Sequence, residues 1–235
     1  MKYIYGIYVW LVGGIIFLFT LILIFLLSLF LKPRTLNAIT KSCFQLMLTL
    51  TFMKPTIIYE EIIDKNKAYI FMPNHVSMMD VLMIAGFAPT ICNGIEAHTH
   101  FKWPIYGWFL KTIKQIPINR SSVRDSLVSF QIAKQRLKEN WSIVVYPEGT
   151  RSVTGNLNDF KKLPFKFAKE TSNDIVPVCF IGVSNIAPEK SIFFKPYKVK
   201  MVFGKSIPNE VISKLSADEL LEKVRNDIIR MSENY

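Results

Sequence analysis

The sequence predicts an α/β fold: a central, mostly parallel sheet flanked by helices, with an N-terminal hydrophobic membrane-anchoring helix. Three observations lead to this prediction. After residue 54, short apolar runs alternate with helical patterns, which is typical of layered α/β domains. The apolar runs are rich in β-branched and aromatic residues and lack polar alternation, which is typical of strands buried on both faces. A long uncharged run opens the chain, and the 235 residues suit one domain plus an attachment.

The uncharged run covers residues 3–31 and consists mostly of Ile, Leu, Phe and Val. As a helix it would be about 43 Å long, enough to cross a hydrocarbon core of about 30 Å with some tilt. A cleaved signal peptide would have an apolar region of about 7 to 15 residues followed by small residues at a cleavage site. The run is longer than that and has no such site, so it predicts a retained membrane anchor.

Charges beside the anchor predict its orientation. Lys32, Arg34 and Lys41 follow the run, whereas Lys2 and the terminal amine precede it. Under the positive-inside rule, this small difference places the downstream domain on the cytoplasmic face of the membrane.

A second apolar stretch, residues 42–53, is too short to span a bilayer. It suits an interfacial helix, because it lies next to the anchor, or alternatively a core helix. We therefore expect residues 1–53 to form the membrane anchor and an interfacial helical segment. Residues 54–235 are expected to form the globular domain.

The chain is strongly basic: 29 Lys and Arg stand against 18 Asp and Glu, a formal charge of +11. A basic surface favours anionic lipid, phosphorylated ligands or nucleic acid as partners. It can also serve only to keep the domain in solution, so charge alone does not choose among these.

Residue types that bind metals form no recognisable site in the sequence. Cys43, Cys92 and Cys179 are far apart and have no paired spacing, so we expect reduced thiols rather than a zinc or redox site. The histidines of "HTH", residues 98–100, could supply two metal ligands, but no third ligand is evident. The sequence therefore implies no metal.

Four apolar runs are the predicted strands of the buried sheet: residues 68–73, 142–147, 175–183 and 199–203. Two helices are predicted between them. One covers residues 122–139, with Leu127, Phe130 and Leu137 on one apolar stripe, and Pro164 can open another that runs to about residue 170.

The last helix has the clearest start signal. Ser216 and Glu219 match a capping box, in which each side chain bonds the other residue's backbone N–H. Leu220, Val224 and Ile228 then share one face, which we expect to be buried.

The stretch "PNHVSMMD", residues 73–80, places a histidine near a carboxylate. Helical residues five apart lie about 140° from each other around the axis, so His75 and Asp80 can meet only if one lies outside the helix. Pro73 ends a strand, and Ser77 with Asp80 matches the Ser-x-x-Asp form of a helix N-cap. Asp80 can then hold one imidazole nitrogen and leave the other to take a proton. Alternatively, Asp80 is only a cap carboxylate and His75 an exposed turn residue.

The stretch "YPEGTRS", residues 146–152, directly follows a predicted strand. Because open α/β sheets bind ligands at the carboxyl ends of their strands, its backbone amides and Arg151 are candidates for a phosphate site. The alternative is a salt bridge between Glu148 and Arg151 that only holds the turn.

The stretch "KQIPINR", residues 114–120, places Arg120 after another strand-like run. Lys102 and Lys111 lie nearby in sequence, so a phosphate pocket could collect several cations. Each of these could instead be an ordinary solvated charge.

In this order, the stretches closely resemble the glycerolipid acyltransferase family, typified by 1-acylglycerol-3-phosphate (lysophosphatidic acid) acyltransferase. The family has an Asn-His-x4-Asp block, a block ending in Ile-Asp-Arg, a Glu-Gly-Thr-Arg block and a Val-Pro-Val type block. These correspond here to residues 74–80, 118–120, 148–151 and 176–178. The resemblance spans about residues 68–205, and residues 54–235 are thus the expected acyltransferase domain. Asn119 departs from the pattern, since many members carry aspartate there.

The resemblance implies transfer of a fatty acyl group from acyl-CoA or acyl carrier protein to the sn-2 hydroxyl of 1-acylglycerol 3-phosphate, giving phosphatidic acid. His75 would be the base that takes the hydroxyl proton, and Asp80 would hold its tautomer. The expected substrate-binding residues are Asn74, Lys102, Arg120, Glu148, Gly149, Thr150 and Arg151. Apart from the acyl donor and the lysophosphatidic acid in the membrane, no cofactor, metal or nucleic acid is implied.

Further expectations concern the surroundings of the base. Glu148 is expected to orient an arginine or a glycerol hydroxyl. Backbone amides at the start of the helix capped by Ser77 are candidates to stabilise the oxyanion, and Ser77 as a nucleophile is the alternative. Six apolar side chains are expected to line an acyl channel or, alternatively, to pack in the core: Met78, Met79, Phe101, Trp103, Trp108 and Phe109.

Two other functions also fit the sequence. One is the same chemistry on glycerol 3-phosphate or a different lysolipid. The other is a non-catalytic, basic, membrane-tethered module that binds anionic lipid or nucleic acid. The second leaves the His-x4-Asp spacing and the "PEGTR" turn unexplained.

Overall fold

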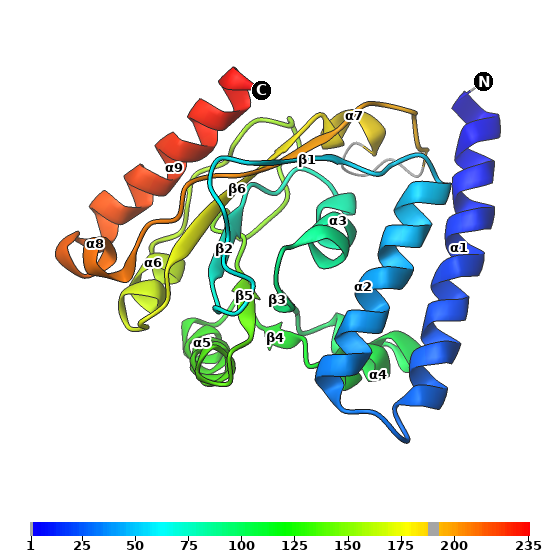
Figure 1. Ribbon diagram of the computed structural model, residues 1–235, viewed down its shortest axis with the longest axis horizontal. Helices are drawn as coiled ribbons and strands as arrows, with labels where there is room; N and C mark the ends of the chain where they lie inside the picture. The colour runs from blue at the N-terminus through cyan, green and yellow to red at the C-terminus, as the bar shows by residue number, and fades with distance from the viewer. Residues whose placement is uncertain (1, 188–192) are drawn as a thin grey trace.

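The computed structural model describes residues 2–187 and 193–235. Within these residues, seven strands form one sheet in the order β1-β7-β6-β2-β5-β3-β4 (Figure 1). The strands are β1 (Thr56–Tyr59), β2 (Ile70–Pro73), β3 (Cys92–Ala97), β4 (Ile116–Ile118), β5 (Ser142–Val144), β6 (Ile175–Ile181) and β7 (Lys200–Phe203). Neighbours pair in parallel except β6 and β7, so the predicted mostly parallel α/β sheet is confirmed.

Helices cover both faces of the sheet (Figure 1). They are α1 (Lys2–Leu27), α2 (Pro33–Leu50), α3 (Met79–Phe87), the 3-10 turn η1 (His100–Lys102), α4 (Pro104–Thr112), α5 (Val123–Lys138), α6 (Lys162–Lys169), α7 (Val183–Ile186), α8 (Asn209–Lys214) and α9 (Ala217–Asn234). Successive residues of β2 face opposite sides, as a strand requires. Phe71 packs with α3 and α7, whereas Ile70 and Met72 pack with α5, α6 and α9.

The predicted strands and helices are mostly confirmed, with shifted ends. All four predicted strands are present as β2, β5, β6 and β7, and the run before Arg120 forms β4. Helix α9 has the predicted capping box at Ser216, and its three predicted apolar residues are buried. Helix α6 begins at Lys162, two residues before Pro164.

One predicted stripe needs correction. In α5, Ser122 caps the helix, its hydroxyl oxygen accepting the Asp125 N–H at 3.1 Å. Leu127, however, is 48% exposed. The buried stripe runs through Ser126, Phe130, Ala133 and Leu137, because small residues face the sheet where the helix approaches it closely.

The N-terminal helices lie side by side along one flank of the domain (Figure 1). Among the described residues, α1 is the one helix whose length and composition would allow it to cross a bilayer. Helix α2 begins at Pro33, well before the predicted residue 42, since proline is well suited to the first helical turn.

Both readings of residues 42–53 have support in the packing of α2. Phe44, Met47 and Leu48 are buried against the domain, whereas Leu46 and Leu50 expose apolar side chains. Helix α2 is thus a core helix on its inner face and has an apolar outer face beside α1.

Candidate active site

The sheet brings three of the sequence motifs to one edge. β2 ends at Pro73 and β5 at Val144, and these two central strands are parallel neighbours. β4 ends at Ile118 and runs parallel to β3, which is parallel to β5. Because parallel strands end at the same edge, the segments after β2, β4 and β5 meet there.

His75 and Asp80 form the predicted contact. His75 Nδ1 lies 3.0 Å from Asp80 Oδ2, and both side chains are buried. The same Oδ2 accepts the N–H groups of Val76 at 2.7 Å and Ser77 at 2.8 Å. Burial raises the pKa of Asp80, while the His75 ring and these two amides act in the opposite direction. The contact leaves Nε2 as the imidazole nitrogen that can take a proton.

The predicted Ser-x-x-Asp cap at Ser77 is present, because the Ser77 oxygen accepts the Met79 N–H at 3.3 Å and Asp80 accepts the Ser77 N–H at 2.8 Å. The Ser77 hydroxyl also donates to the Ala187 carbonyl at 2.9 Å. The oxyanion donors at the start of α3, which begins at Met79, stay a prediction. The amides of Val76 and Ser77 already bond Asp80, so neither is free to bind an oxyanion.

Glu148 holds the backbone of the histidine loop. Its Oε1 accepts the His75 N–H at 2.6 Å, and its Oε2 accepts the Asn158 N–H at 2.9 Å. Burial raises its pKa to about 7. We expected Glu148 to orient an arginine or a glycerol hydroxyl, but its side chain is 1% exposed and both oxygens face backbone amides.

The "PEGTRS" turn and the histidine loop are joined in both directions. Besides the bond to Glu148, the His75 carbonyl accepts the Ser152 N–H at 2.7 Å. Gly149 has φ 74°, a left-handed conformation that glycine adopts without steric cost. Thr150 and Arg151, the residues that follow, are exposed.

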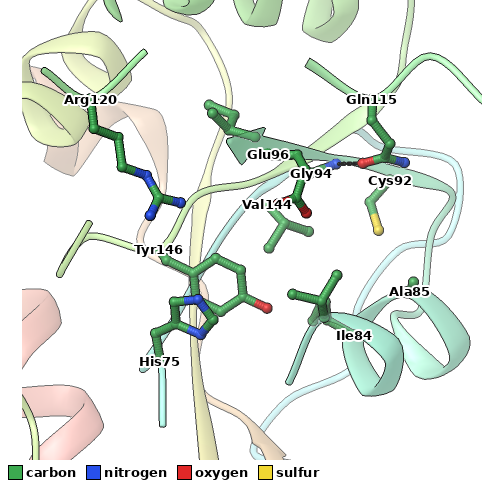
Figure 2. Close-up of a pocket in the computed structure, with 12 residues that line it drawn as sticks. His75, Ile84, Ala85, Cys92, Gly94, Glu96, Gln115, Arg120, Val144 and Tyr146 are labelled. Carbon is green, nitrogen blue, oxygen red and sulfur yellow. Dashed lines mark hydrogen bonds between the residues drawn. The ribbon is translucent and has the colours of Figure 1, made fainter. Parts of the chain in front are cut away.

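Arg120 points toward His75 and Tyr146 across the cavity (Figure 2). Burial and the like charge of Arg151 lower the pKa of Arg120, while Glu96 opposes this shift. Arg151 is exposed and is not among the residues that line the cavity, whereas Arg120 is. Asn119, the departure from the family pattern, bonds Asp125 and Ser121 and so fixes the turn behind Arg120.

Two expected substrate-binding residues lie elsewhere. Asn74 pairs its side-chain amide with the backbone of Phe180, donating at 3.1 Å and accepting at 2.7 Å, and so ties β2 to β6. Lys102 is exposed on η1 and is not among the residues that line the cavity at His75.

The cavity beside His75 has about 490 Å³ of space, including its open mouth. Its apolar walls come from Val81, Ile84, Ala85, Cys92, Ile95 and Val144, not from the six side chains proposed for an acyl channel. Met79 and Phe109 are buried in the core. The wall residues lie on α3, β3 and β5, whose assembly cannot be read from local sequence.

Tyr146 and Glu96 were not predicted as site residues. The Tyr146 ring stacks on the His75 ring, with centroids 3.9 Å apart and planes at 25°. Glu96 lines the cavity, and its Oε1 lies 2.7 Å from His100 Nδ1. The sequence contained one signal for each residue: Tyr146 is the first residue of "YPEGTR", and Glu96 lies four residues before His100. Within the described residues, no group of three side chains could hold a metal ion.

The fold and the site define an α/β enzyme with a buried histidine–carboxylate pair at a cavity that Arg120 lines. A model of the Acyltransferase family matches residues 54–181, which is more than half of the chain. The chain therefore belongs to the acyltransferase family, in which no cofactor is generally required.

Curated relatives share this domain. A 1-acyl-sn-glycerol-3-phosphate acyltransferase of Chlamydomonas reinhardtii is 28% identical over 182 residues, 77% of this chain and 53% of the algal protein. Proteins of the same name in Saccharomyces cerevisiae and Borreliella burgdorferi are each 29% identical, over 84% and 82% of this chain. The chain spans 66% of the yeast protein and 77% of the Borreliella protein.

A solved structure supports the fold over nearly the whole chain. The crystal structure of the 1-acyl-sn-glycerophosphate (LPA) acyltransferase PlsC from Thermotoga maritima matches with a TM-score of 0.83 and 22% identity. The match covers 99% of this chain and 97% of the other, so α1 and α2 belong to the shared architecture.

Proposed function

We propose that this protein transfers a fatty acyl group from an acyl thioester to the sn-2 hydroxyl of 1-acylglycerol 3-phosphate and so forms phosphatidic acid. The observation that carries the proposal is the 3.0 Å contact between His75 Nδ1 and Asp80 Oδ2 at a cavity that Arg120 also lines. The names of the relatives agree with this acceptor.

His75 is the general base in this proposal. An alcohol is a poor nucleophile near neutral pH, so its proton must be removed as it attacks. With Nδ1 held by Asp80, Nε2 takes the proton of the sn-2 hydroxyl while its oxygen adds to the thioester carbon. The same imidazolium then returns the proton to the leaving thiolate. Because the acceptor attacks directly, no acyl-enzyme forms and Ser77 has no covalent role.

Arg120 and Arg151 hold the glycerol phosphate. A planar guanidinium can offer two parallel N–H bonds to phosphate oxygens, which fixes both the position and the orientation of the acceptor. The mutual repulsion of the two arginines is relieved when a dianion binds between them. Gly149 and Thr150 shape the turn that carries Arg151 to this place.

The apolar part of the cavity takes the acyl chain of the donor. Val81, Ile84 and Val144 surround it with aliphatic surface, and methylene groups bind such surfaces by leaving water. Acyl-CoA and acyl carrier protein present the same thioester, so both remain candidate donors.

Helices α1 and α2 attach the enzyme to the membrane that holds its acceptor. Many large apolar side chains of α1 are exposed, among them Ile4, Ile7, Leu11, Ile15, Leu18 and Ile22. Contiguous apolar surface of this kind marks a partner or a membrane. We place the catalytic domain on the cytoplasmic face, because the basic residues after α1 are attracted to the anionic lipids of the cytoplasmic leaflet.

The test is acyl transfer by detergent-solubilised wild type and by His75→Ala, with defined acyl-CoA and, in parallel, acyl carrier protein as donors. The acceptors are 1-acylglycerol 3-phosphate, glycerol 3-phosphate and a lysolipid with a larger head group. We expect product with the first acceptor, and a loss of at least about 10²-fold in the variant.

Circular dichroism and the thermal midpoint check that His75→Ala is folded. Equal product from both proteins would remove His75 from the mechanism. No product from the wild type with any donor and acceptor would favour a membrane-tethered binding module.

A further inference from the structure

The hydroxyl of Tyr146 is a buried polar group that the protein itself does not satisfy. Across residues 2–187 and 193–235, its oxygen is shielded from solvent and makes no hydrogen bond. Buried hydroxyls are normally paired, because an unpaired one loses its bonds to water and gains none in return. An unpaired hydroxyl beside a reactive cavity therefore indicates a partner that arrives with the substrate.

Tyr146 is fixed in the catalytic cavity by its ring. The ring stacks on the imidazole of His75 at 3.9 Å, so the hydroxyl is held at a set distance from the base. Figure 2 shows this hydroxyl pointing away from Arg120, toward the side where Ile84 and Val144 lie. These two side chains are aliphatic and offer no acceptor atom.

The backbone amides next to the base are already occupied. The N–H groups of Val76 and Ser77 bond Asp80, and the N–H of His75 bonds Glu148. Attack on a thioester turns its carbonyl oxygen into an oxyanion, which needs donors placed in advance. These three amides cannot supply them without releasing the two carboxylates that shape the loop.

We propose that the Tyr146 hydroxyl donates a hydrogen bond to the carbonyl oxygen of the bound acyl thioester and to the oxyanion formed from it. This inference rests on the proposed function and adds a catalytic residue to it. The acceptor oxygen forms the new C–O bond, His75 takes its proton, and the oxyanion collapses as the C–S bond breaks. The leaving sulfur receives the proton from His75, and Tyr146 keeps its own proton throughout.

Two features suit Tyr146 to this role. Burial, and next the charge of Asp80, raise the pKa of Tyr146 well above its ordinary value, so the phenol stays protonated and remains a donor. The hydroxyl also starts without a partner, so no existing bond has to break when the substrate binds.

The competing explanation is a bound water. Asp80 Oδ1 is likewise buried without a partner among the described residues, and a water could join it to the Tyr146 hydroxyl. In that case Tyr146 would act on the basicity of His75 rather than on the thioester. The two explanations differ in the hydrogen-bond partner of the hydroxyl: the thioester carbonyl oxygen in the first, and a water bound to Asp80 in the second.

The test compares wild type and Tyr146→Phe with two non-reactive analogues of one acyl-CoA. A ketone analogue replaces the sulfur by methylene and keeps the carbonyl, whereas a thioether analogue keeps the sulfur and lacks the carbonyl. By calorimetry, we expect the variant to bind the ketone about 10-fold more weakly and the thioether within about 2-fold of wild type. In turnover, kcat should fall about 10²-fold, with a smaller change in the KM of the acceptor.

Tyr59→Phe is the matched control, because it removes the same hydroxyl oxygen from a tyrosine far from the cavity. Tyr59 is 47% exposed and lies on the edge strand β1. Tyr146→Phe keeps the stacked ring, so its thermal midpoint should equal or exceed that of wild type. A lower midpoint together with equal weakening of both analogues would assign Tyr146 a structural role and overturn the inference.

Two other results would also overturn it. Unchanged binding of the ketone, with a shifted pH profile of kcat, would assign the hydroxyl to a water at Asp80. If Tyr146→Phe bound both analogues as wild type does and its kcat stayed within about 3-fold of wild type, the oxyanion would need no bond from Tyr146. Failure of the wild type itself to transfer acyl groups or to bind the ketone would refute the proposed function, and this inference with it.

Discussion

At the scale of single residues, two carboxylates shape the catalytic loop by accepting hydrogen bonds from its backbone. Asp80 bonds the His75 ring and two amides that follow it, and Glu148 bonds the His75 amide from the turn after β5. His75 is therefore held on both its ring and its main chain. In the proposed function the acceptor is bound by arginines instead, so the geometry of the base is set separately from the affinity for the acceptor.

Replacing Arg120 should affect binding more than chemistry. Lysine in Arg120→Lys keeps the charge but cannot form the two parallel bonds of a guanidinium. We expect the KM for 1-acylglycerol 3-phosphate to rise about 10-fold while kcat falls less than about 3-fold, measured by initial rates. Arg225→Lys, on α9, is the control. A fall in kcat at constant KM would place Arg120 on the reacting atoms instead.

The burial of Glu148 should make stability depend on pH. Its pKa of about 7 lies above the ordinary value of 4.5, so the folded state favours the protonated carboxyl. Its contribution to stability is therefore full below about pH 4.5 and is lost as the pH rises through about 7. The free energy of unfolding of wild type, relative to Glu148→Gln, should fall by at most about 3 kcal/mol over this window.

Denaturant unfolding at pH 4.5, 6 and 8 measures this difference. The quantity compared between pH values is the free energy of unfolding of wild type minus that of Glu148→Gln. Any effect of the glutamine side chain that does not depend on pH therefore cancels. A difference that stays flat or rises with pH would contradict the raised pKa.

At the scale of elements, the sequence predicted four apolar runs as strands but missed β1 and β3. β3 escaped prediction because Asn93, Gly94 and Glu96 interrupt its apolar pattern. Asn93 is nonetheless buried, since its side chain donates to the Ile113 carbonyl at 3.1 Å. A polar residue whose partner comes from another element cannot be recognised as buried from its own neighbourhood.

The same limit applies to the candidate site. The contact between His75 and Asp80 was predictable because it depends on a turn of eight residues. The partners of Glu148 and the stacking of Tyr146 depend on how β2 and β5 align, with Phe71 opposite Val144. That register is set by the packing of the whole sheet, so these contacts appear only in three dimensions.

The cap of α9 should contribute measurably to stability. The Ser216 hydroxyl accepts the Glu219 N–H at 3.1 Å, and Glu219 accepts the Ser216 N–H at 2.7 Å. Ser216→Ala removes one of these bonds and should cost about 1 kcal/mol, or about 2 to 4 °C in thermal midpoint. Ser213→Ala, which removes an exposed hydroxyl bonded to Glu210 on α8, should shift the midpoint by less than about 1 °C. Equal shifts would show that the capping box adds nothing.

At the scale of the whole molecule, α1 is bound to the domain along its length. Near its start, the Tyr8 hydroxyl donates to the Leu50 carbonyl at 2.7 Å, and the Trp10 ring meets the Phe194 ring with centroids 5.5 Å apart. Near its end, Phe25 packs against Trp108 at 5.2 Å. A helix of 26 residues is about 39 Å long, so a span would carry one end across the bilayer and away from these partners.

These contacts lead to a prediction about topology. With α1 held against the domain, its exposed apolar face should lie in one leaflet, and both ends of the chain should be on the same side of the membrane. The measurement uses sealed vesicles containing protein with a protease-cleavable tag at either end. External protease should cleave both tags to the same extent, and detergent should expose the remainder of both. If the protease instead cleaved one tag in some vesicles and the other tag in the rest, the two ends would lie on opposite sides and α1 would span the bilayer. The packing of α1 against α2 and α4 would then have to be broken in the membrane.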